Sequence, residues 1–338
     1  MKATKRMGLK DVARVSGLSQ ATVSRYLNGS IVLPEATVAR IESAILECNY
    51  TPNAYARRLS LGRSDVIGLI LPDISNAFFG LLAASVEAEA AAFGLSLFLS
   101  PTSNSRVREI ECLQKLRESL VDGVIFATNT PDDGSLARVI ADVGPNIVLV
   151  DEDVPGVKCP KIFSDNRQGG RLAAQHFVER GHRYLAYVAG PAELLSTVER
   201  GSGFKEIIAA AGLPEPVVMA GNYSVMHGEK SLSGIVSRYP QVTGVFAGSD
   251  EIMIGMLREL RRVPQETAAR LSIITFDDVG PLDLISSGIT AVRQDVKEIG
   301  RRAVRALVSQ MRPTEVDCPK LDAVPVELVS RNSVNKIV

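Results

Sequence analysis

The chain has 338 residues, which is too long for one compact core and predicts about two or three folding units. Its 46% hydrophobic and 22% charged residues are the ordinary balance of a globular protein. The longest apolar runs, such as Val66–Leu71, have only the length of strands, which excludes a membrane span and a membrane partner. No apolar stretch of signal-peptide length follows the basic residues 1–7, so we expect the protein to remain in the cytoplasm.

The cysteines give no sign of a disulfide framework or a metal site. Cys48, Cys112, Cys159 and Cys318 lie far apart, without a CxxC pair and without a nearby histidine. We therefore expect buried or incidental thiols, no metal and no cofactor.

Charge is unevenly distributed along the chain. Residues 1–64 hold ten Lys or Arg against four Asp or Glu, and the remaining residues hold 28 against 34. A basic small end on an acidic body indicates that the small end meets a polyanion, although a basic tail that only improves solubility would look the same.

The first fifty residues predict three helices. Apolar residues at helical spacing mark Leu9–Ser16, and Gly17 ends this helix. Ser19 is a good N-cap for a second helix, Gln20–Leu27. A third helix, Glu35–Cys48, carries an apolar stripe that includes its final cysteine, which is therefore a core residue.

Two short helices joined by a glycine turn and braced by a third form a helix-turn-helix. The second helix of such a unit offers its outward residues to the major groove, here Gln20, Ala21 and Arg25. Gln can pair with adenine, Arg with guanine, and Ala can contact a thymine methyl group. The alternative is the exposed face of a small helical bundle without any DNA role.

After residue 51 the pattern changes. Residues 51–60 begin like a helix of about two turns, which is marginal in isolation, and residues 61–64 resemble a linker. From residue 65 strand-like and helical runs alternate, which predicts parallel sheets covered by helices on both faces. The predicted strands are Val66–Leu71, Leu95–Ser100, Gly123–Ala127, Ile147–Val150, Tyr184–Ala189, Val242–Ala247 and Leu271–Phe276, and the clearest helices are Phe78–Phe93, Gly169–Arg180, Ser202–Ala211 and Glu251–Arg262.

This length of α/β pattern predicts two doubly wound lobes, with a ligand cleft at the carboxyl ends of their strands. The predicted domains are an all-α helix-turn-helix headpiece (residues 1–51), a hinge helix and linker (52–64), and an α/β effector and dimerisation domain of two lobes (65–338).

Several segments resemble the lactose-repressor (LacI) family of bacterial regulators. Leu9–Arg14 and Gly17–Asn28 are similar to the headpiece signature of that family, and Asn49–Leu59 is similar to its hinge helix. The likeness continues through Val66–Asp73, Arg180–Arg183 and Phe276–Asp278.

The resemblance implies a homodimer that binds a pseudo-palindromic operator in double-stranded DNA. The base contacts would be Gln20, Ala21 and Arg25, and the phosphate contacts Ser19, Thr22, Ser24 and Asn28. Paired hinge helices would insert Leu59 into the minor groove, with Asn53, Tyr55 and Ala56 beside it.

The resemblance also implies an effector domain like the periplasmic sugar-binding proteins. Its expected effector contacts are Asp73, Asn76, Phe78, Phe79, Asn166, Arg200, Tyr223, Asp277 and Gln294. Planar polar groups for hydroxyls and aromatic faces for CH patches suit a sugar or another polyol. The alternatives are that Phe78 and Phe79 pack the first helix of the domain, that Arg200 only opens a helix, and that Asp277 caps a turn with Asp278.

The sequence departs from the family pattern at three positions. Pro34 stands where a polar N-cap is usual. Ser249 replaces the commoner asparagine before Asp250 in the cleft, which affects one ligand contact. Ser60 follows Leu59 where some members have lysine.

Two other classes of function compete with a repressor. An enzyme is disfavoured because the sequence has no phosphate loop, no G-x-S-x-G and no H-E-x-x-H motif. A transport receptor would share the two-lobed domain, but it would need an export signal and no headpiece. Whether the effector releases DNA or strengthens its binding is left open by the sequence.

Overall fold

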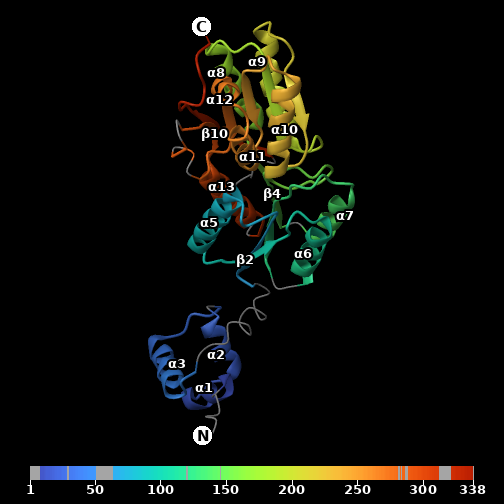
Figure 1. Cartoon of the computed structure of the whole chain (residues 1–338). Helices are drawn as coiled ribbons and strands as arrows, with labels where there is room; N and C mark the ends of the chain where they lie inside the picture. The colour runs from blue at the N-terminus through green and yellow to red at the C-terminus, as the bar shows by residue number, and fades with distance from the viewer. Residues whose placement is uncertain are drawn as a thin grey trace, which may run out of the picture. The chain divides into compact units, whose positions relative to one another are not determined.

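The computed structural model describes residues 8–28, 30–50, 64–118, 121–144, 146–280, 282, 284–285, 288–311 and 321–337. The chain divides into two compact units, Met1–Asp65 and Val66–Val338 (Figure 1). The predicted hinge residues Asn53, Tyr55, Ala56 and Leu59, and also Ser60 and Cys318, lie outside the described residues.

The first unit contains the three predicted helices, α1 (Leu9–Ser16), α2 (Gln20–Leu27) and α3 (Glu35–Glu47). Their shared core is formed by buried apolar residues, namely Val12, Ala13, Val23, Ile41, Ala44 and Cys48. The predicted core position of Cys48 is therefore confirmed, and this thiol is free, as are those of Cys112 and Cys159 among the described residues.

The turn between α1 and α2 depends on Gly17. Its φ of 67° is left-handed, and a Cβ there would lie 2.8 Å from Arg40 Nη2, which donates a hydrogen bond to the Ser16 carbonyl oxygen. Ser19 Oγ accepts from the Thr22 amide at 3.1 Å, which confirms the predicted N-cap. At the start of α3, Pro34 makes no side-chain cap, and its carbonyl oxygen accepts the first amide hydrogen bonds instead.

The second unit begins with an N-terminal lobe built on one parallel sheet. The strand order is β11-β5-β4-β3-β1-β2, and the strands are β1 (Val66–Leu71), β2 (Ser96–Pro101), β3 (Gly123–Phe126), β4 (Ile147–Val150), β5 (Lys161–Ser164) and β11 (Leu321–Val324). One face packs against α5 (Ala77–Ala92) and α13 (Val296–Met311), and the other against α6 (Arg106–Glu118) and α7 (Ser135–Val143).

The C-terminal lobe repeats this plan. Its sheet has the order β12-β10-β9-β8-β6-β7, with β6 (Leu185–Ala189), β7 (Val217–Ala220), β8 (Gly244–Ala247), β9 (Ser272–Phe276), β10 (Thr290–Gln294) and β12 (Val326–Val329), of which only β12 pairs antiparallel. One face is covered by α8 (Asn166–Glu179) and α9 (Leu195–Ala210), and the other by α10 (Val225–Arg238) and α11 (Asp250–Leu260), which is followed by the short α12 (Gln265–Arg270).

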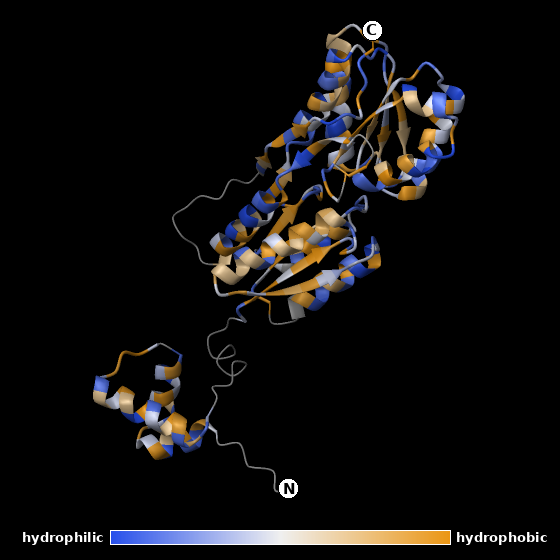
Figure 2. Cartoon of the chain, turned by 60° about the vertical axis from the view of Figure 1, so that its left-hand side comes forward, coloured by the Kyte–Doolittle hydropathy of each residue, from blue (hydrophilic) through white to orange (hydrophobic). Residues whose placement is uncertain are grey.

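Burial explains why these segments form strands. Every residue of β3, β4, β6, β8 and β9 is buried, as expected for parallel strands with helices on both sides. In Figure 2 the central strands of both sheets have the colour of hydrophobic residues, whereas the helices carry both colours. The predicted pair of doubly wound lobes is confirmed. None of the helices in the described ranges is long and apolar enough to cross a membrane.

The chain passes between the lobes three times, at β5–α8, at β10–α13 and at β11–β12. Two hydrogen bonds tie these crossings together. Ser164 Oγ donates to Gln294 Oε1, and the Asp165 amide donates to the Val324 carbonyl oxygen at 2.8 Å. The strand-like runs marked in the sequence did not include β5, β7, β10, β11 and β12.

Two predicted helix starts were wrong. Helix α8 begins at Asn166 rather than Gly169, and α9 begins at Leu195 rather than Ser202, so Arg200 lies inside α9 and does not open it. Glycines lower the helical propensity of both segments, but here they let the two helices approach each other. A Cβ on Gly170 would lie 2.0 Å from the Arg200 carbonyl oxygen. Tertiary packing therefore overrides the local preference.

Candidate functional site

A cavity of about 40 Å³ lies at the carboxyl ends of both sheets. This is the ligand position that doubly wound sheets favour. Its walls are Asn76, Phe78, Phe79, Asn129, Asp151, Ser196, Arg200, Tyr223, Ser249, Asp250, Glu251, Asp277 and Gln294. The structure thus brings together seven of the nine effector residues expected from the sequence.

The other two, Asp73 and Asn166, do not line the cavity. Asp73 Oδ1 accepts hydrogen bonds from the amide and the hydroxyl of Ser75, both at 2.8 Å, in the turn that leads to α5. Asn166 Oδ1 accepts from Arg200 Nε at 2.8 Å. Their contact with an effector stays a prediction.

The entrance to α5 supplies three wall residues. Asn76 Oδ1 caps this helix by accepting from the amides of Phe78 and Phe79, at 2.9 and 3.4 Å. Asn76 Nδ2 reaches Asp250 Oδ1, which belongs to the other lobe, at 3.5 Å. The two phenylalanine rings meet edge to face and belong to the N-terminal lobe core, so they pack α5 and line the cavity at once.

Arg200 is the positive charge of the cavity wall, and it is only 4% exposed. Its Nη1 donates to the Gly248 carbonyl oxygen at 2.6 Å, and its guanidinium stacks on the Phe276 ring, 3.6 Å from the centroid. Both hydrogen-bond partners of the side chain, Asn166 and Gly248, are neutral. Within the described part of the chain, Nη2 has no hydrogen-bond partner and is therefore available to a ligand.

Two cavity aspartates follow directly on buried strands and have left-handed backbones. Asp277 follows β9 with φ 75°, and Asp151 follows β4 with φ 70°. This conformation costs a residue other than glycine about 1–2 kcal/mol, and such strain gathers at functional sites. Asp277 accepts a hydrogen bond from Gln294 Nε2, another residue of the cavity wall.

The carboxylates of the cavity have raised pKa values, which indicates that too little positive charge lies near them. Burial raises the pKa of Asp151 to about 6 although the nearby Arg200 opposes the rise. Burial and the neighbouring carboxylate of Asp277 raise the pKa of Asp250 to about 7. Asp277 itself has a raised pKa because of burial, again opposed by Arg200.

Behind the wall lies Glu152, which is 1% exposed. Its carboxylate accepts from the amide of Ser196 at 3.2 Å and from the hydroxyl of the same residue. The Tyr223 hydroxyl in turn bonds with Ser196 Oγ and Thr197 Oγ1, at 2.9 and 2.8 Å. Tyr223 can sit there because residue 190 is glycine: a Cβ on Gly190 would meet its ring at 2.3 Å.

The ionisation of Glu152 predicts a pH-dependent stability. Burial and the charge of Asp151 raise the pKa of Glu152 to about 8, so the folded chain keeps this proton while the unfolded chain loses it above about pH 4.5. Stability is therefore lost as the pH rises from about 4.5 to 8. We compare the free energy of unfolding of Glu152→Gln with that of the parent at two pH values. The variant's advantage over the parent should be larger at pH 8.5 than at pH 4.5, by more than about 1.4 kcal/mol. Urea unfolding at both pH values measures it, and an equal difference at both would contradict the assignment.

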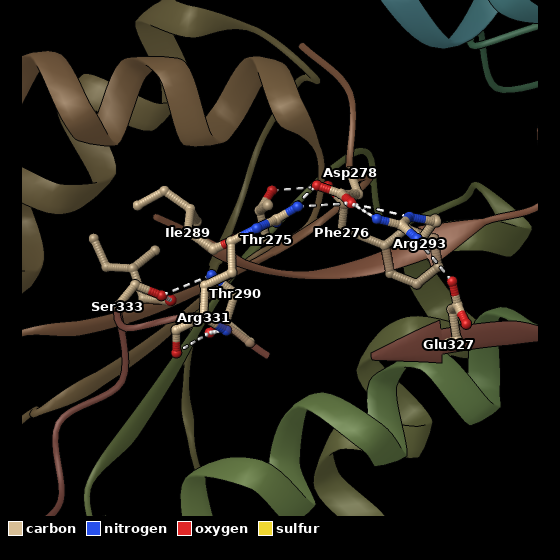
Figure 3. Close-up of polar contacts among 10 residues, drawn as sticks. Thr275, Phe276, Asp278, Ile289, Thr290, Arg293, Glu327, Arg331 and Ser333 are labelled. Carbon is tan, nitrogen blue, oxygen red and sulfur yellow. Dashed lines mark hydrogen bonds and ion pairs between the residues drawn. The ribbon is translucent and has the colours of Figure 1, made fainter. Parts of the chain in front are cut away.

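An ion-pair cluster holds the loop that carries Asp277 (Figure 3). Asp278 pairs with Arg331 at 2.8 Å and with Arg293 at 2.5 Å, and Arg293 also pairs with Glu327 at 3.0 Å. Burial alone would raise the pKa of Asp278, but the hydrogen bonds from the two arginines outweigh it and lower that pKa. The cluster joins the ends of β9, β10 and β12 and so fixes the loop beside the cavity.

In the first unit, the structure exposes the three residues predicted to read bases, Gln20, Ala21 and Arg25. Ser19 is exposed too, and the other predicted phosphate contacts are half-buried, namely Thr22, Ser24 and Asn28. All of them lie on or next to α2, the second helix of the motif.

Six wall residues are not among the effector contacts expected from the sequence: Asn129, Asp151, Ser196, Ser249, Asp250 and Glu251. The sequence places Ser249 and Asp250 in the cleft, but only as a departure from the family pattern that affects one ligand contact. In the structure Ser249 Oγ caps α11 by accepting from the Ile252 amide at 3.3 Å. Five of the six follow β3, β4 or β8 within about four residues, so the polar residues that come soon after each buried strand are a usable signal.

Comparisons with known proteins agree with this architecture. Residues 8–53 match the family of bacterial regulatory proteins, lacI family, and residues 174–334 match the periplasmic binding protein-like domain. The ribose operon repressor of Halalkalibacterium halodurans is 30% identical over 96% of each chain.

Solved structures also share the fold. The transcriptional regulator CelR in complex with cellobiose is 28% identical, with a TM-score of 0.73 over 97% of this chain and 100% of that one. The lac repressor dimer bound to operator and the anti-inducer ONPF has a TM-score of 0.83 over 98% and 100% of the two chains, at 23% identity, which shows the fold.

LacI-family repressors are DNA-binding regulators controlled by small-molecule effectors such as sugars. The helix-turn-helix, the two doubly wound lobes and the near full-length match agree on one assignment. This chain belongs to the LacI family of bacterial transcription regulators.

Proposed function

We propose that this chain is a repressor that binds its operator as a homodimer. A small carbohydrate bound between the lobes controls the affinity for the operator, either weakening or strengthening it. The observation that carries the proposal is the cavity, which combines aromatic faces with amide, carboxylate and guanidinium groups. Such a wall suits hydroxyls and CH patches on one ligand. The ribose operon repressors and the CelR–cellobiose complex, which are similar to this chain, bear names that point to sugars.

The division of labour follows from the two units. We propose residues 1–51 as the DNA-binding domain, 52–64 as hinge and linker, and 65–338 as the effector and dimerisation domain. We also propose that the protein acts in the cytoplasm, where its DNA partner is, and that it binds its effector without converting it.

The test uses the purified full chain. A selection from randomised DNA should enrich one pseudo-palindromic sequence, and a thermal-shift screen of sugars, sugar acids, polyols and nucleobases should find a stabilising ligand. At a hundred times its Kd a ligand adds about 2.7 kcal/mol to stability. Chromatography of that ligand after incubation should recover it unchanged. No enriched sequence would contradict a repressor, and a converted ligand would indicate an enzyme.

Arg25 gives a sharper prediction for the DNA face. If it bonds a guanine, Arg25→Ala should remove about 1–3 kcal/mol of discrimination at one operator position, because the bidentate contact is lost. The matched control is Arg14→Ala, which removes an exposed arginine of α1 that pairs with Asp11 at 3.6 Å. The control should change no single position in the randomised selection. An even loss of affinity in Arg25→Ala, with selectivity intact, would make Arg25 a phosphate contact.

A further inference from the structure

The charges on the cavity wall do not balance. Among the described residues the wall carries four carboxylates, Asp151, Asp250, Glu251 and Asp277, against the single guanidinium of Arg200. Glu152 lies behind the wall, but its raised pKa of about 8 keeps it protonated near pH 7, so it adds no charge. Buried ionised groups are costly unless opposite charges or hydrogen bonds compensate them.

Arg200 does not compensate these carboxylates directly. Both of its hydrogen bonds go to neutral oxygens, and among the described residues no carboxylate lies within the 4.0 Å that defines an ion pair with it. In the part of the chain that the structure describes, Asp277 accepts a hydrogen bond only from the neutral amide of Gln294. Asp250 accepts only from neutral groups within the described ranges, namely the side-chain amide of Asn76, at the long distance of 3.5 Å, and the backbone amide of Glu251.

Asp151 is the least satisfied of the four. The residue is 9% exposed and faces the cavity, and in the described ranges its carboxylate has neither a hydrogen bond nor an ion pair. Its strained backbone holds it at this place. The wall therefore presents a buried acceptor that the protein itself leaves unfilled.

We infer that the effector carries a protonated amino group, borne on a small polyhydroxylated framework, and that this group binds between Asp151 and the carboxylates of the opposite lobe. This inference rests on the proposed function and narrows the class of its ligand to amino sugars and amino polyols. An ammonium group brings three donors and one positive charge, which a hydroxyl cannot supply.

Two observations support a cation on the ligand. Burial raises the pKa values of Asp151 and Asp250 to about 6 and 7, so at pH 7 Asp151 is mostly ionised and Asp250 is ionised in about half of the molecules, at a desolvation cost that an ammonium group would offset. A metal ion would be the other source of charge, but the described residues contain no group of three His, Cys, Asp or Glu side chains that could hold one.

The test compares matched ligand pairs by calorimetry on the full chain at pH 7 in phosphate buffer. Each amine is paired with its neutral counterpart: serinol with glycerol, 1-amino-1-deoxyglucitol with glucitol, and glucosamine with glucose and N-acetylglucosamine. We expect at least one amine to bind about tenfold to a hundredfold more tightly than its neutral partner, the ratio that one charge-assisted hydrogen bond contributes.

Three variants identify the carboxylates. Asp151→Asn and Asp250→Asn should each remove the preference for the amine while leaving the thermal midpoint of the ligand-free protein unlowered, because burial already penalises these charges. Asp142→Asn, which changes an exposed aspartate of α7 outside the cavity, should keep the preference.

Equal or tighter binding of the neutral partners would overturn the inference and leave the cavity as a site for uncharged sugars. If neither the amines nor their neutral partners bind at up to 50 mM, the binding free energy is weaker than roughly −2 kcal/mol. That result would overturn the inference too. Operator selection with the same preparation decides the proposed function separately, so the two failures are distinguishable.

Discussion

Replacing Arg200 by methionine should weaken effector binding by about tenfold to a hundredfold for each charge-assisted bond that is lost. Methionine retains an apolar chain against the Phe276 ring, but it removes the donors to Asn166 and Gly248 and the nitrogen left free for the ligand. Operator binding by the ligand-free variant should change little, because the first unit holds the DNA face. Calorimetry with the ligand found by thermal shift measures the first effect.

The same variant should show a change in pH dependence. Arg200 opposes the burial that raises the pKa values of Asp151 and Asp277, so its loss should raise both further. Stability should then fall more steeply as the pH rises from about 5 to 8, because the folded state holds more protons than the unfolded state over that range. The control is Arg171→Met, which removes an exposed arginine that pairs with Glu206 at 2.8 Å. Unchanged effector affinity in Arg200→Met would place the site elsewhere.

Gly170→Ala should strongly destabilise the protein. Its Cβ would lie 2.0 Å from the Arg200 carbonyl oxygen and 2.9 Å from the Phe204 amide nitrogen, and both are backbone atoms that cannot rotate away. Helices α8 and α9 must therefore separate, at a cost of about 3 kcal/mol or more, and the movement displaces Arg200.

The matched control for this substitution is Gly80→Ala in α5. There the nearest atom to the new Cβ is the Ile74 carbonyl oxygen at 3.6 Å, an ordinary contact. Alanine is the better helix former by about 1 kcal/mol, so this variant should be as stable as the parent or more stable. Urea unfolding compares the two substitutions. Equal free energies of unfolding for Gly170→Ala and the parent would refute the close packing of α8 on α9.

The sequence predicts local elements well where one signal dominates. Helices α1 and α2 have the predicted bounds because a left-handed Gly17 and the Ser19 cap define both sides of the turn. The bounds of β1 and β4 are also predicted without error, because a run of buried residues is the dominant signal there. In contrast, β10 and β12 are short, carry exposed Arg293 and Glu327, and pair only after the chain has crossed between the lobes. No local sequence signal identifies β10 and β12 as strands.

The candidate site divides in the same way. Residues directly after a buried strand, such as Asp151 and Asp277, are predictable from topology because parallel strands end at the ligand edge. Asn129, three residues after β3, follows the same rule, whereas Ser196 does not, since it reaches the cavity from within α9. The balance of charge in the cavity depends on which groups become neighbours, so it appears only in the assembled structure.

We expect the cavity and the DNA face to be energetically coupled. The most direct test is calorimetry of effector binding to the full chain, with and without saturating operator DNA. Coupling between two sites is reciprocal and amounts to about 1–3 kcal/mol in typical cases. The effector Kd should therefore change about fivefold or more on adding operator, and the operator Kd should change by the same factor on adding effector. Equal effector affinities with and without operator would contradict the account.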